Sequence, residues 1–68
     1  LKKTYPCVLN AANEEAVKLF LNGKIKFIDV YNIVEQTLNA HTPLNEALTY
    51  DTIVKADLWA REYVRRMY

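Results

Sequence analysis

Apolar residues recur at helical spacing in three stretches of this chain, and the pattern predicts α-helices over residues 5–22, 29–41 and 50–67. Within each stretch they return every three or four positions, the spacing that places them on one face of a helix. Each helix is therefore expected to pack by this face against the others. The expected buried stripes are Tyr5, Leu9, Ala12, Ala16 and Phe20 in the first helix, Val30, Ile33, Val34, Thr37 and Leu38 in the second, and Ile53, Ala56, Ala60, Val64 and Met67 in the third.

Residues with marked preferences for helix ends delimit these stretches. Thr4 is expected to cap the first helix, and the Asn-Gly pair at 22–23 is expected to end it. Asp29 or the residue before it caps the second helix, which ends before Pro43, because the residue preceding a proline avoids the helical region. Thr49 is expected to cap the third helix. The three predicted helices are thus separated by two short connections.

The composition fits one small helical domain. The chain has 68 residues, of which 51% are hydrophobic and 25% are charged, and it contains one glycine and two prolines. These proportions argue against disorder and against a turn-rich β architecture, and a chain of this length forms a single domain with a small core. The predicted fold class is therefore all-α, a small three-helix bundle in which residues 1–68 form one domain.

The charge balance and the single cysteine limit the classes of partner. Nine Lys and Arg residues against eight Asp and Glu residues give a formal net charge of +1, which provides no electrostatic basis for binding nucleic acid or an anionic membrane. No apolar run approaches the roughly 18 residues that a membrane span needs. Cys7 is the only cysteine, so it has no internal disulfide partner, and a reducing environment is expected.

Two polar residues interrupt the expected apolar stripes. Asn13 lies within the first stripe and Asp57 within the third. A buried polar group without a partner costs about 1–3 kcal/mol, so each is expected to hydrogen-bond to a neighbouring segment. Arg61, one turn after Asp57, is the expected partner of that carboxylate. The sequence therefore predicts a structural polar core made of Asn13, Asp57 and Arg61.

The other charged residues of the first helix are expected to face solvent. Glu14 and Lys18 are four positions apart and are expected to form a favourable surface pair worth a few tenths of a kcal/mol. Glu15 is expected on the same solvated face. Although Glu14 and Glu15 adjoin in sequence, neighbouring residues on a helix point about 100° apart, so we do not expect them to share a substrate.

No set of residues matches a catalytic or metal-binding pattern. Cys7 and His41 supply a thiol and an imidazole, but nothing in the sequence brings them together, and we expect a buried structural cysteine and a solvent-facing loop histidine. Asp29, Glu35 and Glu46 do not have the spacing of a known metal-binding loop. The predicted catalytic, cofactor-binding and metal-binding sets are therefore empty.

Aromatic and basic residues are mixed in the last part of the chain. Such a mixture occurs in proteins that bind single-stranded nucleic acid, but at helical spacing it more often forms the edge of a core beneath long cationic side chains. A free-standing module that binds a partner helix or nucleic acid through Trp59, Tyr63 and Arg66 of this surface is one alternative function, and an independent enzyme that uses Cys7 is another. The residues of this mixed surface are Trp59, Arg61, Tyr63, Arg65, Arg66 and Tyr68.

Three stretches together resemble a known family. They are Pro-Cys-Val-Leu-Asn-Ala-Ala-Asn-Glu at 6–14, Phe-Leu-Asn-Gly-Lys-Ile-Lys-Phe at 20–27, and Ala-Asp with Trp-Ala-Arg-Glu at 56–57 and 59–62. In this order they resemble the C-terminal helical domain of the 1-deoxy-D-xylulose 5-phosphate reductoisomerase family. The resemblance covers nearly the whole chain. Ile28 departs from it, since members often have Thr as a helix cap at this position.

The resemblance implies a function for a longer parent chain. Members of that family use NADPH and a divalent metal ion, magnesium or manganese, to convert 1-deoxy-D-xylulose 5-phosphate to 2-C-methyl-D-erythritol 4-phosphate in non-mevalonate isoprenoid biosynthesis. The dinucleotide, metal and phosphate sites lie in preceding domains, so no catalytic residue is assigned to this chain. The resemblance further implies a four-helix bundle with one helix upstream, a structural role against the preceding domains, a homodimeric parent, and a bacterial cytoplasm or plastid-type organelle.

Overall fold

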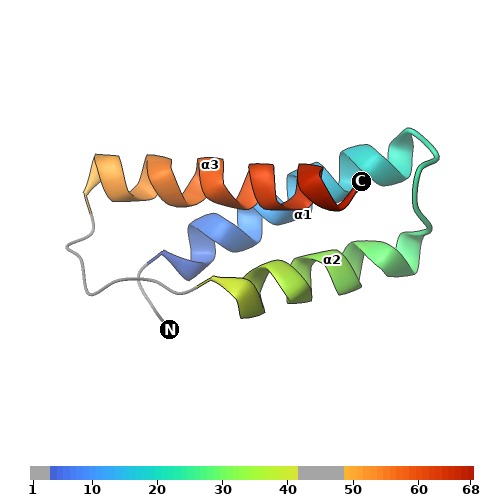
Figure 1. Ribbon diagram of the computed structural model, residues 1–68, viewed down its shortest axis with the longest axis horizontal. Coiled ribbons are helices and arrows are strands. Elements are labelled where there is room, and N and C mark those ends of the chain that lie inside the picture. Colours follow the sequence, from blue (N-terminus) through green and yellow to red (C-terminus); the bar gives the residue numbers. More distant parts are fainter. Residues whose placement is uncertain (1–3, 42–48) are drawn as a thin grey trace.

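The computed structural model describes residues 4–41 and 49–68, and these residues form three α-helices (Figure 1). Helix α1 spans Tyr5–Leu21, α2 spans Phe27–Ala40 and α3 spans Tyr50–Met67. No strand is present in this described part of the chain. The all-α, three-helix architecture predicted from the apolar spacing is confirmed.

Within residues 4–41 and 49–68, no helix combines the length and the apolar character that crossing a bilayer requires.

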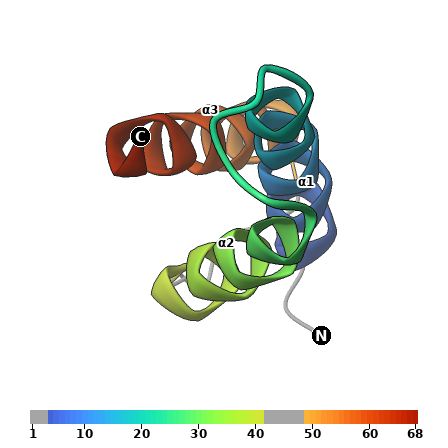
Figure 2. The ribbon, with the colours of Figure 1, turned by 90° about the vertical axis from the view of Figure 1, so that its right-hand side faces the viewer.

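Helix α1 lies against both other helices, whereas α2 and α3 have little contact with each other. Figure 2 shows α2 and α3 diverging from α1 in different directions, so the three helices form an open arrangement with α1 at its vertex. The molecule is elongated, with extents of 38 × 18 × 16 Å. Helix α1 is therefore buried along two faces, while α2 and α3 are each buried along one.

Small residues on α1 allow both neighbouring helices to approach closely. Four alanines or valines of α1 are fully buried, and they divide between two apolar clusters. Ile33 of α2 is 2% exposed, and burying a side chain of this size contributes about 1.5–3 kcal/mol. One cluster joins all three helices through Ala12, Ala16, Val30, Ile33 and Val64, and the other joins α1 to α3 through Val8, Ala11, Ala56 and Ala60.

The buried face of α1 is rotated from the face predicted by the stripe. Leu9 is 47% exposed and Phe20 is 37% exposed, although both were expected in the core. Val8 and Ala11 are fully buried instead. The physical reason is that α1 packs against α2 on one side and against α3 on another. The centre of its buried surface therefore lies between these two contacts and does not coincide with the most apolar stripe. The Leu9 side of α1 remains open.

The end of α1 is a Schellman motif, as the Asn-Gly pair predicted. The Lys24 N–H donates to the Leu19 carbonyl at 2.9 Å, and the Gly23 N–H donates to the Phe20 carbonyl at 3.0 Å. This pattern requires a left-handed residue, and Gly23 has φ of 74°. The chain therefore turns sharply into α2.

Helix α2 begins at Phe27, two residues earlier than expected. Asp29 is the third residue of this helix and not its N-cap, and it caps the backbone from that position. Its carboxylate accepts a hydrogen bond from the Lys26 N–H at 2.9 Å, and this contact satisfies the backbone just before the first turn. Thr49 caps α3 as predicted, since its hydroxyl accepts from the Thr52 N–H at 3.2 Å. The expected role of Pro43 falls outside the described residues.

Replacing Gly23 by alanine is expected to lower the free energy of unfolding by about 1 kcal/mol, because an alanine at positive φ is strained. Nothing lies within 4 Å of the added methyl group, so the loss would measure backbone strain alone. Urea unfolding of the 68-residue chain gives the value. Asn22→Ala is the control, because Asn22 has φ of −87° and should change stability by less than about 0.5 kcal/mol. Equal effects of the two substitutions would show that strain at Gly23 is not the cause.

Candidate functional site

The most buried charge in the described part of the molecule is the Glu15 carboxylate, which lies between α1 and α3. Its side chain is 7% exposed. It accepts hydrogen bonds from Arg61 Nη1 at 3.0 Å, from Arg65 Nε and Nη2 at 3.2 Å each, and from Lys18 Nζ at 3.4 Å. Burial alone would raise the pKa of Glu15, but the hydrogen bonds from Arg65, Arg61 and Lys18 lower it below its ordinary value. Glu15 is therefore held as a carboxylate.

Arg61 connects this carboxylate to two more. Its Nε donates to Asp57 Oδ2 at 2.9 Å, and its Nη2 donates to Glu14 Oε1 at 3.0 Å and to Asp57 Oδ1 at 3.3 Å. These carboxylates, Asp57 first, raise the pKa of the Arg61 guanidinium. We call this group, made of Glu14, Glu15, Asp57, Arg61 and Arg65, the α1–α3 ion cluster. It cross-links the two helices by directional contacts.

The ion cluster corrects the predicted surface role of Glu15. This residue is buried, and Glu14 pairs with Arg61 and not with Lys18. Although Glu14 and Glu15 point in different directions on α1, the guanidinium of Arg61 is broad enough to receive both. One sequence signal was available, because Glu15 lies one turn after Ala11 and Ala12, on the side of α1 that carries its smallest residues.

Only part of the predicted polar core is found in the structure. Asp57 and Arg61 do form the expected i,i+4 pair, at the half-buried edge of the bundle with side-chain exposures of 34% and 19%. Asn13 is exposed and makes no hydrogen bond to another described residue, so its expected position inside the core is wrong. The rotation of α1 turns Asn13 toward the open side.

His41 lies in a cluster that joins the beginning of α1, the end of α2 and α3. Its Nε2 is 2.8 Å from Thr4 Oγ1, and its carbonyl accepts from the Tyr5 hydroxyl at 3.2 Å. Its ring contacts Tyr5 edge-on and Trp59, each with centroids 5.2 Å apart, and Trp59 in turn stacks on Tyr63. Burial lowers the pKa of the imidazole. The expectation of a solvent-facing histidine is therefore wrong.

Cys7 does not join His41 in this arrangement. It is half-buried against the apolar cluster between α1 and α3. The imidazole Nε2 is directed to Thr4, and within the described residues no hydrogen bond joins the thiol to the imidazole. A nucleophilic pair of the kind that the two residue types permit is not assembled here.

Carboxylates elsewhere are also separate from one another. Asp29 caps α2, Glu35 lies at the edge of a surface groove, and Glu46 is outside the described residues. Within residues 4–41 and 49–68, no group of three or more His, Cys, Asp or Glu side chains could hold a metal ion.

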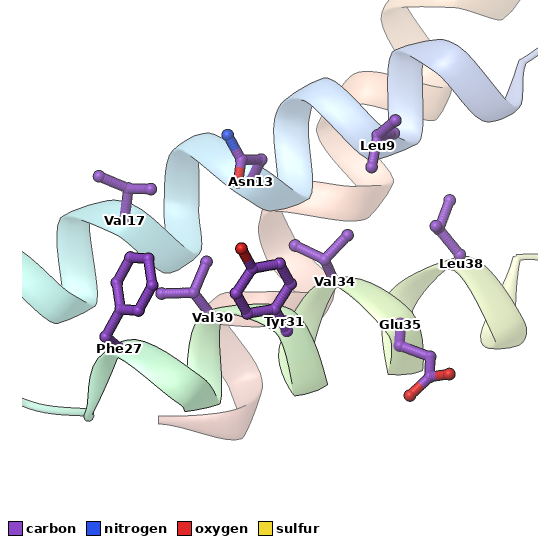
Figure 3. Close-up of a pocket in the computed structure, with 9 residues that line it drawn as sticks. All are labelled: Leu9, Asn13, Val17, Phe27, Val30, Tyr31, Val34, Glu35 and Leu38. Carbon is purple, nitrogen blue, oxygen red and sulfur yellow. The ribbon is translucent and has the colours of Figure 1, made fainter.

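An apolar groove lies between α1 and α2 (Figure 3). It consists of two adjoining hollows of about 370 Å³ and 410 Å³ that share Leu9 and Leu38. We call it the α1–α2 groove. Its lining is Tyr5, Pro6, Leu9, Asn13 and Val17 from α1, and Phe27, Val30, Tyr31, Val34, Glu35, Leu38 and Asn39 from α2.

Comparison with known proteins assigns this three-helix bundle to a family. The family model described as the DXP reductoisomerase C-terminal domain matches residues 1–63 of the chain. The chain belongs to the DXP reductoisomerase C-terminal domain family. The resemblance inferred from the three sequence stretches is thereby confirmed.

Full-length relatives of this reductoisomerase domain are much longer than the chain. A 1-deoxy-D-xylulose 5-phosphate reductoisomerase from Gloeobacter violaceus is 52% identical over 62 residues, which are 91% of this chain and 16% of the relative. The protein of the same name from Chlorobaculum tepidum is 47% identical over 96% of this chain and 17% of its own length. The chain thus spans about a sixth of the curated relatives it matches. No solved structure matches the chain.

Several residues of the three stretches that carried the family resemblance belong to the α1–α3 ion cluster or to the turn after α1. Glu14 ends the first stretch, and Asp57 and Arg61 lie in the third; Arg61 binds both carboxylates. The Gly23 turn lies in the second stretch. The recognisable stretches therefore include residues that end α1 and residues that cross-link α1 to α3.

Replacing Glu15 by glutamine is expected to lower the free energy of unfolding by about 1.5–3 kcal/mol, because it removes the buried charge that accepts hydrogen bonds from both Arg61 and Arg65. Urea unfolding of the 68-residue chain at pH 7 measures the loss. Glu62→Gln is the matched control, since Glu62 forms an exposed i,i+4 pair with Arg66 and should matter by less than about 0.5 kcal/mol. A Glu15→Gln variant as stable as Glu62→Gln would refute the cross-linking role.

The stability of the chain is expected to fall as pH decreases below about 6.5, because the pKa of His41 is lowered on folding and protonation then favours the unfolded state. The carboxylate of Glu15 contributes a separate loss only at pH below its ordinary value of 4.5, since its pKa is also lowered. His41 is the only histidine, so His41→Gln should remove most of the pH dependence between 7.5 and 5.5 in urea unfolding. An unchanged slope in this variant would exclude His41 as its source.

Proposed function

We propose that this domain is the structural C-terminal part of an enzyme that converts 1-deoxy-D-xylulose 5-phosphate to 2-C-methyl-D-erythritol 4-phosphate in non-mevalonate isoprenoid biosynthesis. The parent enzyme uses NADPH and a divalent metal ion, magnesium or manganese. Support comes from the family match over residues 1–63 and from the name of the relatives. The oxidoreductase and isomerase chemistry belongs to the part of the parent chain that precedes this domain.

The α1–α2 groove carries the proposal of a structural role. Along it, Leu9 is 47% exposed, Phe27 is 60% exposed and Tyr31 is 63% exposed. A small soluble domain rarely leaves a continuous apolar face of this kind uncovered unless it is an interaction site. The preceding domains of the same polypeptide are the proposed partner. By packing on this face, the bundle buttresses the central domain and couples its position to closure over substrate.

Two features disfavour the rival reading of a free-standing nucleic-acid or helix-binding module. The basic residues near Trp59 are largely engaged, with Arg61 and Arg65 on Glu15 and Arg66 on Glu62. Trp59 itself is half-buried beneath His41. We therefore propose that the parent binds no nucleic acid through this surface. We place it as a homodimer in a bacterial cytoplasm or a plastid-type organelle.

A charge placed in the groove should damage the parent enzyme. Leu9→Asp in the full-length protein is expected to lower its stability by about 2–3 kcal/mol and to reduce turnover, because an aspartate buried beneath the preceding domains has no partner. Thermal unfolding and steady-state turnover of the sugar phosphate measure the two effects.

Leu58→Asp is the matched control for this experiment. Leu58 is 55% exposed on α3 and does not line the groove, so the same substitution there should change stability by less than about 0.5 kcal/mol. Full stability and turnover with Leu9→Asp would remove the support for docking through this face.

A further inference from the structure

Helix α2 is attached to the bundle differently from α3. The α1–α3 ion cluster places charge-assisted hydrogen bonds across the contact between α1 and α3. Among the described residues, α2 makes no hydrogen bond or ion pair to α1 or α3 along its length, and the buried hydroxyl of Thr37 donates back to the Ile33 carbonyl of α2 itself at 2.7 Å. Apolar packing therefore holds the length of α2, with Val30 and Ile33 buried against the other helices.

The two ends of α2 are held in different ways. Before α2 the chain turns at Gly23, which has φ of 74° and nothing within 4 Å of the place where a Cβ would lie. Residues 22–24 and 26 of this connection are exposed. A short exposed connection of this kind can absorb the change in backbone angles that a pivot requires. The beginning of α2 is therefore suited to act as a hinge.

Contacts of His41 hold the other end, directly after the last residue of α2. Its Nε2 is 2.8 Å from Thr4 Oγ1, and its carbonyl accepts from the Tyr5 hydroxyl at 3.2 Å. The ring of Trp59 on α3 lies 5.2 Å from the imidazole. We call the contacts among Thr4, Tyr5, His41 and Trp59 the His41 latch. This latch supplies the polar contacts that join the end of α2 to the beginning of α1.

Thr4 has a second use for the hydroxyl that it contributes to the latch. It occupies the N-cap position of α1, where a threonine hydroxyl commonly accepts a hydrogen bond from a backbone N–H of the first turn. The Thr4 hydroxyl makes no such bond, because it lies against His41. Release of the latch frees this hydroxyl to cap α1, and the new bond recovers part of the free energy that release costs. The local sequence therefore permits a closed and a released arrangement.

We propose that α2 opens as one unit about the Gly23 turn, that the His41 latch keeps it closed, and that α1 and α3 stay joined by the ion cluster during this opening. Partial opening of this kind occurs in elements that few contacts hold, at a lower free energy than global unfolding. Burial of Val30 and Ile33 makes the open form the minor one. Because α2 forms one wall of the α1–α2 groove, its movement changes the width of that groove.

The first measurement is amide hydrogen exchange of the full-length enzyme, read by mass spectrometry. An isolated helix of 14 residues is marginal in water, so amides of a detached α2 exchange. Opening as one unit predicts equal protection for the two halves of residues 31–40, and exchange faster than that of residues 56–66 of α3 by roughly tenfold or more. Fast exchange confined to the last turn of α2 would indicate fraying and overturn the proposal. Equal protection of α2 and α3 would overturn it as well.

The second measurement tests the latch in the same full-length enzyme. Tyr5→Phe removes only the hydroxyl that donates to the His41 carbonyl, and it is expected to accelerate exchange throughout residues 31–40 by about three- to tenfold. Exchange of α3 should not change, because the ion cluster is intact. Tyr50→Phe is the matched control, since Tyr50 is 81% exposed on α3 and should leave α2 unaffected. Equal effects of the two variants, or an effect of Tyr5→Phe on the last turn alone, would overturn the latch.

Failure of this inference is distinguishable from failure of the proposed function. The Leu9→Asp experiment tests whether the preceding domains depend on the groove, and its result does not require α2 to move. Exchange of α2 and α3 at the same rate, together with a damaged Leu9→Asp enzyme, would overturn the opening of α2 and leave the docking face intact. Exchange of α2 as one unit that responds to Tyr5→Phe supports the opening whatever the outcome for Leu9→Asp.

Discussion

The packing of α1 on two sides is the constraint on which the rest of this structure depends. Helices α2 and α3 have little contact with each other, so each is held in place through α1. This arrangement requires small residues along α1, and Ala11, Ala12 and Ala16 supply them. Among residues 4–41 and 49–68, it also leaves a third side of α1 without a neighbouring helix. The same geometry that makes the core possible therefore creates the α1–α2 groove.

The α1–α3 ion cluster determines how α3 is aligned on α1. Apolar clusters of alanine and valine bury area but specify little about how two helices are aligned, because similar small side chains can slide past one another. Glu15 with Arg61 and Arg65 sets one alignment through several charge-assisted hydrogen bonds. A buried ion pair adds little net stability but is costly to break. Its contribution here is to fix the register of α3 on α1.

At the opposite end of α1, the His41 cluster holds the helix ends together. Thr4 and Tyr5 of the first turn hydrogen-bond to the last residue of the α2 segment, and Trp59 of α3 covers the same imidazole. Gly23 turns the chain just before the other end of α2. Helix α2 is therefore held in place at both ends, while one of its long sides stays open. The apolar seam that stays exposed beside these helices is the face on which the proposed docking rests.

Many local properties of this protein could be predicted from its sequence, although the expected Thr4 cap is wrong, because the Thr4 hydroxyl makes no cap hydrogen bond and lies against His41. Helical spacing, the Asn-Gly stop and the Thr49 cap each depend on residues within a few positions, and the structure agrees with them. Asp57 and Arg61 likewise lie one turn apart. Tertiary structure alone decided which side of α1 is covered, and hence that Glu15 is buried and Asn13 is exposed. These outcomes depend on partners 46 or more positions away, such as Arg61 and Arg65, and periodicity within one helix contains no information about how many neighbours that helix will have.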